Sequence, residues 1–477
     1  GPRGKQGRGG KGGPEGKPDA ESRVREQAGK IVRGVLAGRG AARTHIERAL
    51  ERPELRPGDE GLLTELVYGT IRMVGTLDRL LDACARKGLR KVEEPTLNHL
   101  RVAAYQLVFL EHAHAAIAVD AAVRCAGRRD HVRGFVNGLL RGLQRAIAAR
   151  HPEDDPPAGV PLSRRLPGRD GGWVSFTRDL LPEHEGPAYL AAATSLPYSL
   201  AEAWVEEHGF ARALELARAS NAPPPLALRV NLLRVTRDEV LVELNAAERE
   251  ARPLGTPAGI ALEGGLGEAG YALLWAGKVT VQDETHQRVA PLLEPQPGQR
   301  LVDLCAAPGG KATHLAELLG DQGRVDALDV EEERVARITS ATSRLRLESL
   351  HPALTDPEDP RPPAEVEAPV DGVLVDVPCS NSGVLRRRVE VRWRLERLDW
   401  PPLLRLQARL LDRALELVRP GGAVVYATCS VDPRENQAQV QAALERHAGL
   451  TLEHEQVHLP TRGGGDGGYA ARLRKPG

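Results

Sequence analysis

The sequence predicts a multidomain protein: an all-α N-terminal domain, a small α+β middle domain and a C-terminal α/β domain with a doubly wound, mostly parallel sheet. Helical periodicity without strand alternation fills residues 21–150, whereas apolar strands alternate with helices through residues 278–477. A glycine turn also joins a strand to a helix at residues 301–311. A chain of 477 residues is long enough for about two to four such domains.

Composition excludes several classes of protein. Hydrophobic residues make up 41% and charged residues 27%, an ordinary globular balance, and no apolar run is long enough to cross a membrane. The Gly-rich, basic start lacks the apolar segment of a secretory signal. The five cysteines are scattered without CxxC spacing, so we expect free thiols in a reducing cytoplasm and no structural zinc. Lys+Arg and Asp+Glu both number 65, so a nucleic-acid surface requires local segregation of charge.

The N-terminal part divides into a tail and a helical domain. Residues 1–20 predict a disordered, solvated tail, with weak attraction to RNA as the other interpretation. Because the first residue is Gly rather than Met, we expect the start to be processed or incomplete. The apolar side chains of residues 96–111 follow one helical face. Basic runs at 86–91 and 128–133 are typical of solvated helix faces and would meet RNA only if the rest of the chain handles RNA.

The middle of the chain reads as a connection followed by a small domain. Residues 151–172, rich in Pro, Gly and charge, predict a linker or an inserted loop. Residues 173–277 combine helical patterning with a strand that follows a proline-rich breaker, and Thr236 caps a further helix. Arg229 and Asn231 lie at this strand, where they could contact RNA or simply flank the strand. We therefore expect a small α+β domain here.

Residues 278–477 alternate strands and helices. Strands are predicted at residues 300–305, 324–329, 372–376 and 423–427, and helices at 311–319, 331–345 and 402–418. This alternation requires a mostly parallel sheet covered on both faces. A final strand at residues 468–475 is expected to add antiparallel at the edge of the sheet.

The glycine turn in this domain predicts a small-molecule site. Pro308, Gly309 and Gly310 stand between the first strand and its helix, where glycine allows close approach of a ligand and the helix start offers free N–H groups. Asp329 ends the next strand 20 residues after Gly309 (329 − 309), the usual place for a carboxylate that binds ribose hydroxyls. A glycine turn alone is also common as a structural feature, so this evidence needs a second signal.

Two later strands supply that signal, because each ends in a cysteine followed by serine. Cys379 and Cys429 are 50 residues apart (429 − 379), yet both come just past the carboxyl end of a strand, where ligands bind in open α/β sheets. A single cysteine is usually a small buried hydrophobe, but two in the same setting favour chemistry. The other three are expected to pack in cores: Cys84, Cys125 and Cys305.

Two thiols beside a nucleoside-type cofactor suit methylation of cytosine at carbon 5. This carbon is a poor nucleophile until a thiolate adds to C6 and pushes electron density onto it, and the C5 proton must then leave before the thiol is eliminated. A carboxyl group near N3 and N4, such as that of Asp376, would stabilise the adduct. The base must be unpaired or flipped out for both thiols to reach it.

The same stretches resemble a known family. Residues 279–283, 303–311, 376–383, 421–436 and 466–475 resemble the signatures of RNA cytosine-C5 methyltransferases. In the helical domain, similarity to the RNA-binding domain typified by the antitermination factor NusB covers residues 65–72, 100–110, 116–123 and 135–141. Together they make the chain similar to the Sun/RsmB type, which modifies 16S rRNA. The resemblance implies a Rossmann-like class I methyltransferase domain behind a NusB-like domain.

The resemblance also implies S-adenosylmethionine as cofactor and ribosomal RNA as partner. Cys429 would attack C6, Cys379 would assist product release and Asp376 would contact the cytosine ring. Asp329 would hold the ribose and Asp356 the adenine, whereas Asp303 could lie near the methionine end or merely cap its strand. The implied cofactor-binding residues are Cys305, Ala306, Ala307, Pro308, Gly309, Gly310, Lys311, Asp329, Asp356 and Asp376.

Several points stay open at this level. An arginine-rich segment around Trp393 is either a solvated charge run or a set of phosphate contacts with stacking on the indole. Residues 282–287, which contain His286, replace a version that usually has small residues. Methylation of tRNA and a non-catalytic RNA-binding or antitermination role are the rival functions; we expect a monomer without metal or membrane partners. Candidate RNA contacts are Arg229, Asn231, Arg386, Arg387, Arg392 and Trp393.

Overall fold

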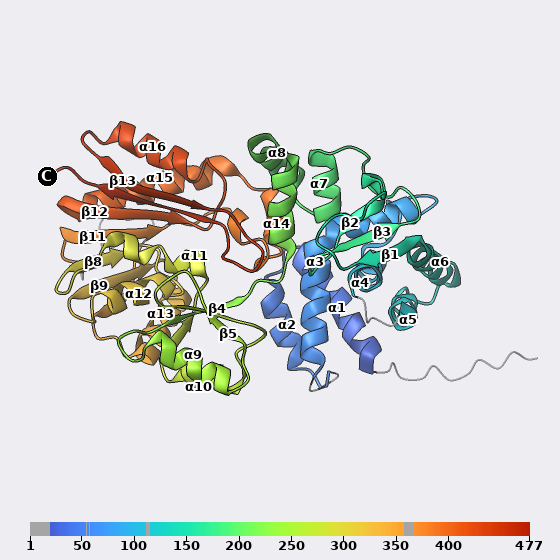
Figure 1. The fold of residues 1–477 in the computed structure, drawn as a ribbon, viewed down its shortest axis with the longest axis horizontal. Coiled ribbons are helices and arrows are strands. Elements are labelled where there is room, and N and C mark those ends of the chain that lie inside the picture. The colour runs from blue at the N-terminus through green and yellow to red at the C-terminus, as the bar shows by residue number, and fades with distance from the viewer. Residues whose placement is uncertain (1–19, 54, 57, 111–114, 357–365) are drawn as a thin grey trace, which may run out of the picture. The chain divides into compact units, whose positions relative to one another are not determined.

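The computed structural model describes residues 20–53, 55, 56, 58–110, 115–356 and 366–477, so residues 1–19 of the predicted tail lie outside it. The described chain forms two compact units (Figure 1). The first covers the residues up to 151 together with 159–166 and 174–181. The second covers 152–158, 167–173 and 182–477.

The first unit is mainly helical, as predicted. Its core is made by the apolar faces of long helices, and the side chains of Leu63, Leu66 and Leu77 are fully buried. A Cβ atom at Gly69 of α3 (Asp59–Cys84) would lie 2.0 Å from the ring of Tyr105 of α4 (Glu94–Phe109). Glycine at this position therefore allows the two helices to pack closely. The helices are α1 (Ala20–Leu36), α2 (Ala42–Leu50), α3 (Asp59–Cys84), α4 (Glu94–Phe109), α5 (Ala115–Cys125) and α6 (Asp130–Ala146).

A small sheet follows α6, and it differs from the sequence prediction. The strands β1 (Ile147–His151), β2 (Arg165–Pro167) and β3 (Trp173–Phe176) form a sheet in the order β1-β3-β2. The sequence predicts no strand before residue 151 and a linker at 151–172, yet β1 lies in the former segment and β2 in the latter. Strands of three to five residues offer too few alternating positions to be recognised from periodicity.

The second unit begins with α7 (Pro187–Thr194) and α8 (Tyr198–Asn221) and continues into a four-stranded sheet of order β5-β6-β4-β7. A capping box between Thr236 and Glu239 starts the first helix packed on this sheet. The sequence starts the last domain at residue 278, but the strand at 279–281 pairs within this smaller sheet. The elements are β4 (Leu226–Val230), α9 (Arg237–Ala246), β5 (Ala251–Pro253), β6 (Gly259–Leu262), α10 (Gly267–Trp275) and β7 (Val279–Val281).

A larger sheet of seven strands has the order β10-β9-β8-β11-β12-β14-β13. All neighbours from β10 to β12 pair in parallel, whereas β14 pairs antiparallel with both β12 and β13. The predicted final strand is therefore antiparallel, but β13 rather than β14 forms the edge. The strands are β8 (Arg300–Asp303), β9 (Arg324–Asp329), β10 (Leu350–Leu354), β11 (Val370–Asp376), β12 (Val418–Thr428), β13 (Thr451–His458) and β14 (Gly468–Arg474).

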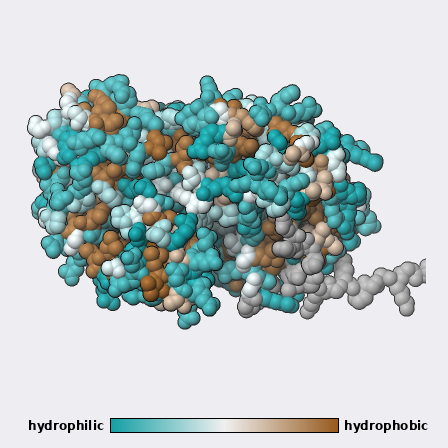
Figure 2. All heavy atoms as spheres, in the orientation of Figure 1, coloured by the Kyte–Doolittle hydropathy of each residue, from teal (hydrophilic) through white to brown (hydrophobic). Residues whose placement is uncertain are grey.

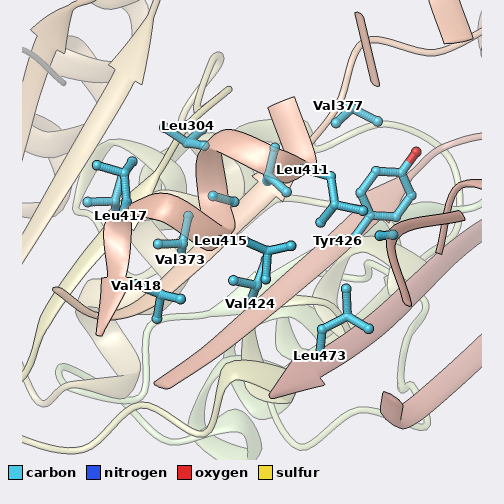
Figure 3. Close-up of a cluster of buried hydrophobic side chains, with 14 of the residues drawn as sticks. Leu304, Val373, Val377, Leu411, Leu415, Leu417, Val418, Val424, Tyr426 and Leu473 are labelled. Atoms are coloured by element: carbon cyan, nitrogen blue, oxygen red, sulfur yellow. The ribbon is translucent and has the colours of Figure 1, made fainter. Parts of the chain in front are cut away.

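Alternate residues of the central strands enter two separate cores, one on each face of the sheet. Val302 and Val373 join the core that contains Leu411, whereas Leu301 and Leu374 join the opposite core. Figure 3 shows the first core, with Val373 and Val424 from strands beside Leu411 and Leu415. The covering helices are α12 (Gly310–Leu318) and α13 (Glu332–Leu345) on one face and α15 (Trp400–Leu417) and α16 (Gln437–Arg446) on the other. The doubly wound α/β domain is thus confirmed.

No helix in the described part of the chain could span a membrane. Its helices are too short or too polar to cross a bilayer. Hydrophilic residues predominate on the face drawn in Figure 2, and the hydrophobic areas on that face are small and scattered.

A buried arginine fastens the smaller sheet to the first helix of the larger sheet. Arg229 on β4 is fully buried and donates to Glu317 of α12 at 2.9 and 3.1 Å, to the carbonyl of Gly310 at 2.7 Å and to Thr313 at 3.0 Å. Glu317 is itself only 7% exposed. The two charges are therefore mutually required, since either one alone would be buried without compensation.

Replacing this arginine should destabilise the second unit strongly. Arg229→Met leaves Glu317 buried and unpaired, so we expect a loss of about 3–5 kcal/mol in unfolding free energy. The double variant Arg229→Met/Glu317→Leu should recover a large part of that loss, because it leaves no uncompensated charge. Urea unfolding followed by circular dichroism compares the three proteins, and equal losses in the single and double variants would contradict this account.

Candidate active site

Three strand ends of the large sheet meet at one edge. The parallel register pairs Asp303 of β8 with Leu374 of β11, and Asp376 of β11 with Ala427 of β12. The loops that follow these strands lie together around a cavity of about 300 Å³. The residues predicted from sequence that line it are Asp303, Cys305, Ala306, Ala307, Pro308, Gly310, Lys311, Asp376, Arg387 and Cys429.

The two cysteines from neighbouring strand ends face each other. Their Sγ atoms are 3.1 Å apart, and Cys429 Sγ also lies 3.3 Å from Asn381 Oδ1. Cys429 lines the cavity, whereas Cys379 is partly exposed and is not among the lining residues. The hydrogen bond with Cys429 and burial together raise the pKa of Cys379 well above its ordinary value, which keeps this thiol protonated.

A buried carboxylate holds both cysteine loops in place. Glu435 accepts from the backbone N–H of Ser380 at 2.7 Å and from Gln407 at 2.9 Å, and its other oxygen bonds to the Ser380 hydroxyl at 2.5 Å. A second link joins the loops directly, because the N–H of Gly383 donates to the carbonyl of Cys429 at 3.0 Å. The short distance between the two thiols therefore depends on contacts outside the cavity.

An ion pair and a second carboxyl group lie beside the thiols. Lys311 Nζ donates to Asp376 Oδ2 at 2.6 Å, and the lysine is 11% exposed. Burial alone would lower the pKa of Lys311, but the charge and hydrogen bond of Asp376 raise it above its ordinary value. Burial and the nearby Asp376 raise the pKa of Asp303 to about 8, so this carboxyl group is mostly protonated at neutral pH. Asp303 Oδ2 is buried and has no hydrogen-bond partner in the described part of the chain.

The glycine turn forms as predicted between β8 and α12. Gly309 has φ = 102°, a conformation that favours glycine, and a Cβ there would lie 3.4 Å from the backbone of Ile338. Asp329 at the end of β9 accepts from the N–H of Ala307 at 3.1 Å and of Val330 at 2.8 Å. These bonds fix the turn against the next strand.

Three predicted cofactor residues are not among those that line the cavity: Gly309, Asp329 and Asp356. β10 pairs Leu354 with Asp329, so exposed Asp356 comes two residues beyond the position opposite that carboxylate. Both acids therefore stand at the same edge of the sheet as the glycine turn. Their roles toward a cofactor stay predictions.

Most of the predicted RNA-contacting residues are engaged by the protein itself, which corrects the prediction. Arg229 is held by Glu317, and Arg386 is 1% exposed and bonded to Asp466 and to the carbonyls of Thr461 and Gly464. Arg392 donates to Asn221 and to the carbonyl of Ser220 at 2.7 Å each. Asn231 is 1% exposed and accepts from the N–H of Leu233. The sequence shows which residues are polar or charged, but it does not show that these side chains already have partners inside the protein.

The remaining two RNA candidates are partly exposed side chains. Arg387 is 30% exposed and lines the cavity, where it donates to Asp466 at 2.5 Å and to Asp283 at 2.8 Å. These two acids raise the pKa of Arg387 against the opposing effect of burial. Trp393 is half-buried on α14 (Val391–Leu395).

Sequence reasoning missed several residues around the cavity. Asp283 and Asp466 fall in the segments that carry the resemblance, but their mutual contact spans 183 residues and had no local signal. His286 lines the cavity and its Nε2 atom is buried without a partner among the described residues. Burial and the nearby Lys311 lower the pKa of His286, so its ring is neutral at physiological pH.

Models of known protein families match three successive parts of the chain. A family model described as 16S rRNA methyltransferase RsmB/F matches residues 290–472, and the NusB family matches residues 22–145. A ferredoxin-like domain of RsmF/B-like methyltransferases matches residues 196–267. These three models cover the helical, the middle and the large-sheet parts of the chain in that order.

Two curated relatives match along nearly their whole length. The probable ribosomal RNA small subunit methyltransferase B of Bacillus subtilis is 33% identical over 453 residues, which is 91% of this chain and 94% of the relative. The protein described in the same words from Synechocystis is 34% identical over 436 residues, 89% of each chain. The crystal structure of PH0851 has a TM-score of 0.71 at 23% identity, covers 94% of this chain and 99% of that chain, and thus shares the fold.

Asp303 should make stability depend on pH. Its pKa is about 8 in the folded chain against an ordinary 3.8, so its contribution to stability is complete below about pH 4 and is lost as pH rises through about 8. The wild-type protein should therefore lose stability relative to Asp303→Asn by at most about 1.4 kcal/mol per pH unit over that range. Thermal unfolding between about pH 5 and pH 9 measures the difference. The exposed Asp238→Asn serves as control, and parallel curves for wild type and Asp303→Asn would contradict the prediction.

Proposed function

The chain belongs to the family of the ribosomal RNA small subunit methyltransferase B proteins, and from that premise we propose that it methylates carbon 5 of a cytosine in 16S rRNA through a covalent cysteine adduct. The enzyme is S-adenosylmethionine-dependent. The observation that carries the proposal is the pair of thiols, Cys429 and Cys379, 3.1 Å apart beside a cavity at the carboxyl edge of the sheet. Neither methyl transfer to other atoms nor cofactor binding alone would require two thiols in this arrangement.

The residues around the glycine turn fit S-adenosylmethionine. Asp303 Oδ2 is buried without a partner among the described residues, and the ammonium group of the methionine part would favour the ionised form of this carboxyl group. The bare backbone at Gly309 and Gly310 leaves room for close approach, and Asp329 and Asp356 stand at the same edge for the ribose and the adenine. When bound, the cofactor supplies an electrophilic methyl group.

Cys429 is the residue we assign to attack on the base, because it is the thiol that lines the cavity. Its sulfur forms a bond to C6 of the cytosine and pushes an electron pair onto C5, which then takes the methyl group. The C5 proton is lost to a base, the C5–C6 double bond returns, and the bond between C6 and sulfur breaks. Lys311 holds one oxygen of Asp376, so the other can accept from the exocyclic amino group of the cytosine.

Cys379 is the residue we assign to product release. Its raised pKa keeps the thiol protonated, and it lies within contact of Cys429 Sγ. It can therefore donate a hydrogen bond to the departing thiolate and stabilise it as the C6 bond breaks. This division of roles rests on the observation that Cys429 lines the cavity and Cys379 does not.

Removing the nucleophile should abolish methylation. Cys429→Ala leaves no thiol to add to C6, so we expect transfer of labelled methyl groups to 16S rRNA to fall by at least about a thousand-fold. Cys125→Ala, on α5 in the first unit, is the matched control and should keep full activity. Undiminished transfer by Cys429→Ala would refute the covalent mechanism.

Removing the second thiol should trap the intermediate instead. Cys379→Ala retains the attacking sulfur but slows its release, so a protein–RNA adduct stable to denaturant should accumulate on electrophoresis. The double variant Cys379→Ala/Cys429→Ala should form none, which identifies the bonded sulfur. Normal turnover by Cys379→Ala without any adduct would show that this thiol has no part in release.

A further inference from the structure

The proposed reaction requires a base that takes the proton from C5 of the methylated adduct. Cys429, Cys379 and Asp376 have other tasks in that reaction. The base must line the cavity that Cys429 lines, and it must have a lone pair that no other contact occupies. It must also be unprotonated when the adduct forms. His286, which lines the same cavity, meets these conditions.

The other proton-accepting side chains that line the cavity in the described chain are engaged or already protonated. Asp376 accepts from Lys311 at 2.6 Å, and both Asp283 and Asp466 accept from Arg387. Two further groups keep their protons at neutral pH because burial raises the pKa of each, namely Asp303 and Cys305. A neutral imidazole is therefore the free acceptor among these lining groups.

The backbone that carries His286 is fixed by its neighbours in the short helix α11 (Glu284–Gln287). The Asp283 carboxylate caps this helix by accepting from the N–H of Thr285 at 2.9 Å, and the Thr285 hydroxyl donates to a backbone carbonyl at 2.7 Å. The amide of Gln287 donates to two further carbonyls at 2.9 and 3.2 Å. By contrast, Nε2 of His286 is buried and has no partner among the described residues. The segment is thus held in place without using this ring nitrogen.

The ring of His286 lies beside the group that we assign to the cytosine. The charged groups that act on the ring are Lys311, Asp376, Asp283 and Asp466. Asp376 is the proposed acceptor for the exocyclic amino group, which is attached to C4, and C4 is bonded directly to C5. A cytosine seated in this way has its C5 one bond away from the atom that carries the amino group. The proton to be removed therefore lies in the part of the cavity near His286.

We propose that His286 is the general base that removes the C5 proton. The C5–H bond breaks as an N–H bond forms on the imidazole, and the released electron pair becomes the C5–C6 double bond. The bond from C6 to the sulfur of Cys429 breaks at the same time, and its electron pair stays on that sulfur. The protonated ring then gives its proton to water. This assignment rests on the proposed function, because only methylation at C5 leaves a proton there to be removed.

A substrate labelled at C5 tests the assignment directly. The assay uses a 16S rRNA transcript with tritium at C5 of its cytosines and a cofactor with a labelled methyl group. In His286→Gln and His286→Ala, tritium release at steady state should fall about a hundred-fold or more, because no base takes the proton. A protein–RNA adduct that carries the labelled methyl group and resists denaturant should accumulate, although both cysteines are present. The exposed His454→Ala on β13 is the control and should release tritium normally.

Two further measurements separate a base from a residue that only supports the fold. Imidazole added to the buffer should restore tritium release in His286→Ala, where it fits the vacated space, but not in His286→Gln. Burial and the nearby Lys311 lower the pKa of His286 below its ordinary 6.5, so kcat/KM of the wild type should fall only below about pH 6.5. That acidic decline should be absent from the residual activity of His286→Gln.

Two results would overturn the assignment. One is normal tritium release by both His286 variants. The other is absence of the adduct in His286→Gln at an unchanged melting temperature, because His286 would then act before methyl transfer. Failure of the proposed function gives a different result: the wild type would transfer methyl groups without releasing tritium, or Cys429→Ala would remain active.

Discussion

The parallel pairing of β11 with β8 and β12 is the constraint on which the candidate active site depends. It brings the loops after three strands to one edge, although their key residues are far apart in the chain. Backbone bonds then fix the loops, as between Gly383 and Cys429 at 3.0 Å and between Gly467 and Gly383 at 2.8 Å. A Cβ at Gly383 would lie 2.4 Å from the carbonyl oxygen of Gly467, so this contact admits only glycine. The thiol pair follows from this packing.

Buried charges of the second unit are paired with opposite charges that lie in direct contact with them. Lys311 is matched by Asp376, Arg229 by Glu317, and Arg387 by two carboxylates. In a medium of low polarity an unmatched charge is costly, so these pairs hold loops and sheets in register more than they add stability. In the first unit, four exposed basic side chains line a groove and form no salt bridge with another described residue: Arg86, Lys87, Arg145 and Arg178. A chain of zero net charge can thus contain both a neutralised core and a positive surface.

Much of the fold could be predicted from periodicity. The long helices of the first unit and the parallel strands β8, β9, β11 and β12 bury one or both faces, and that repetition is visible in sequence. Short or half-exposed strands were missed, namely β5, β6, β7, β10, β13 and the three strands of the first sheet. β13 has mostly exposed side chains and is held by pairing with β14, which is a contact between distant segments. β7 belongs to the smaller sheet because it pairs with β4, which is again a contact between distant segments.

The sequence by itself determined the chemical parts of the candidate site: a glycine turn between strand and helix, an acid at the next strand end, and two cysteines at later strand ends. These are local signals, because turn geometry and strand termination depend on neighbours in the chain. Tertiary structure alone decided that Cys429 lines the cavity whereas Cys379 does not. It also decided that three arginines are buried and bonded to partners inside the protein: Arg229, Arg386 and Arg392. Pairing of charges and access to a cavity depend on residues tens to hundreds of positions away, and composition does not contain that information.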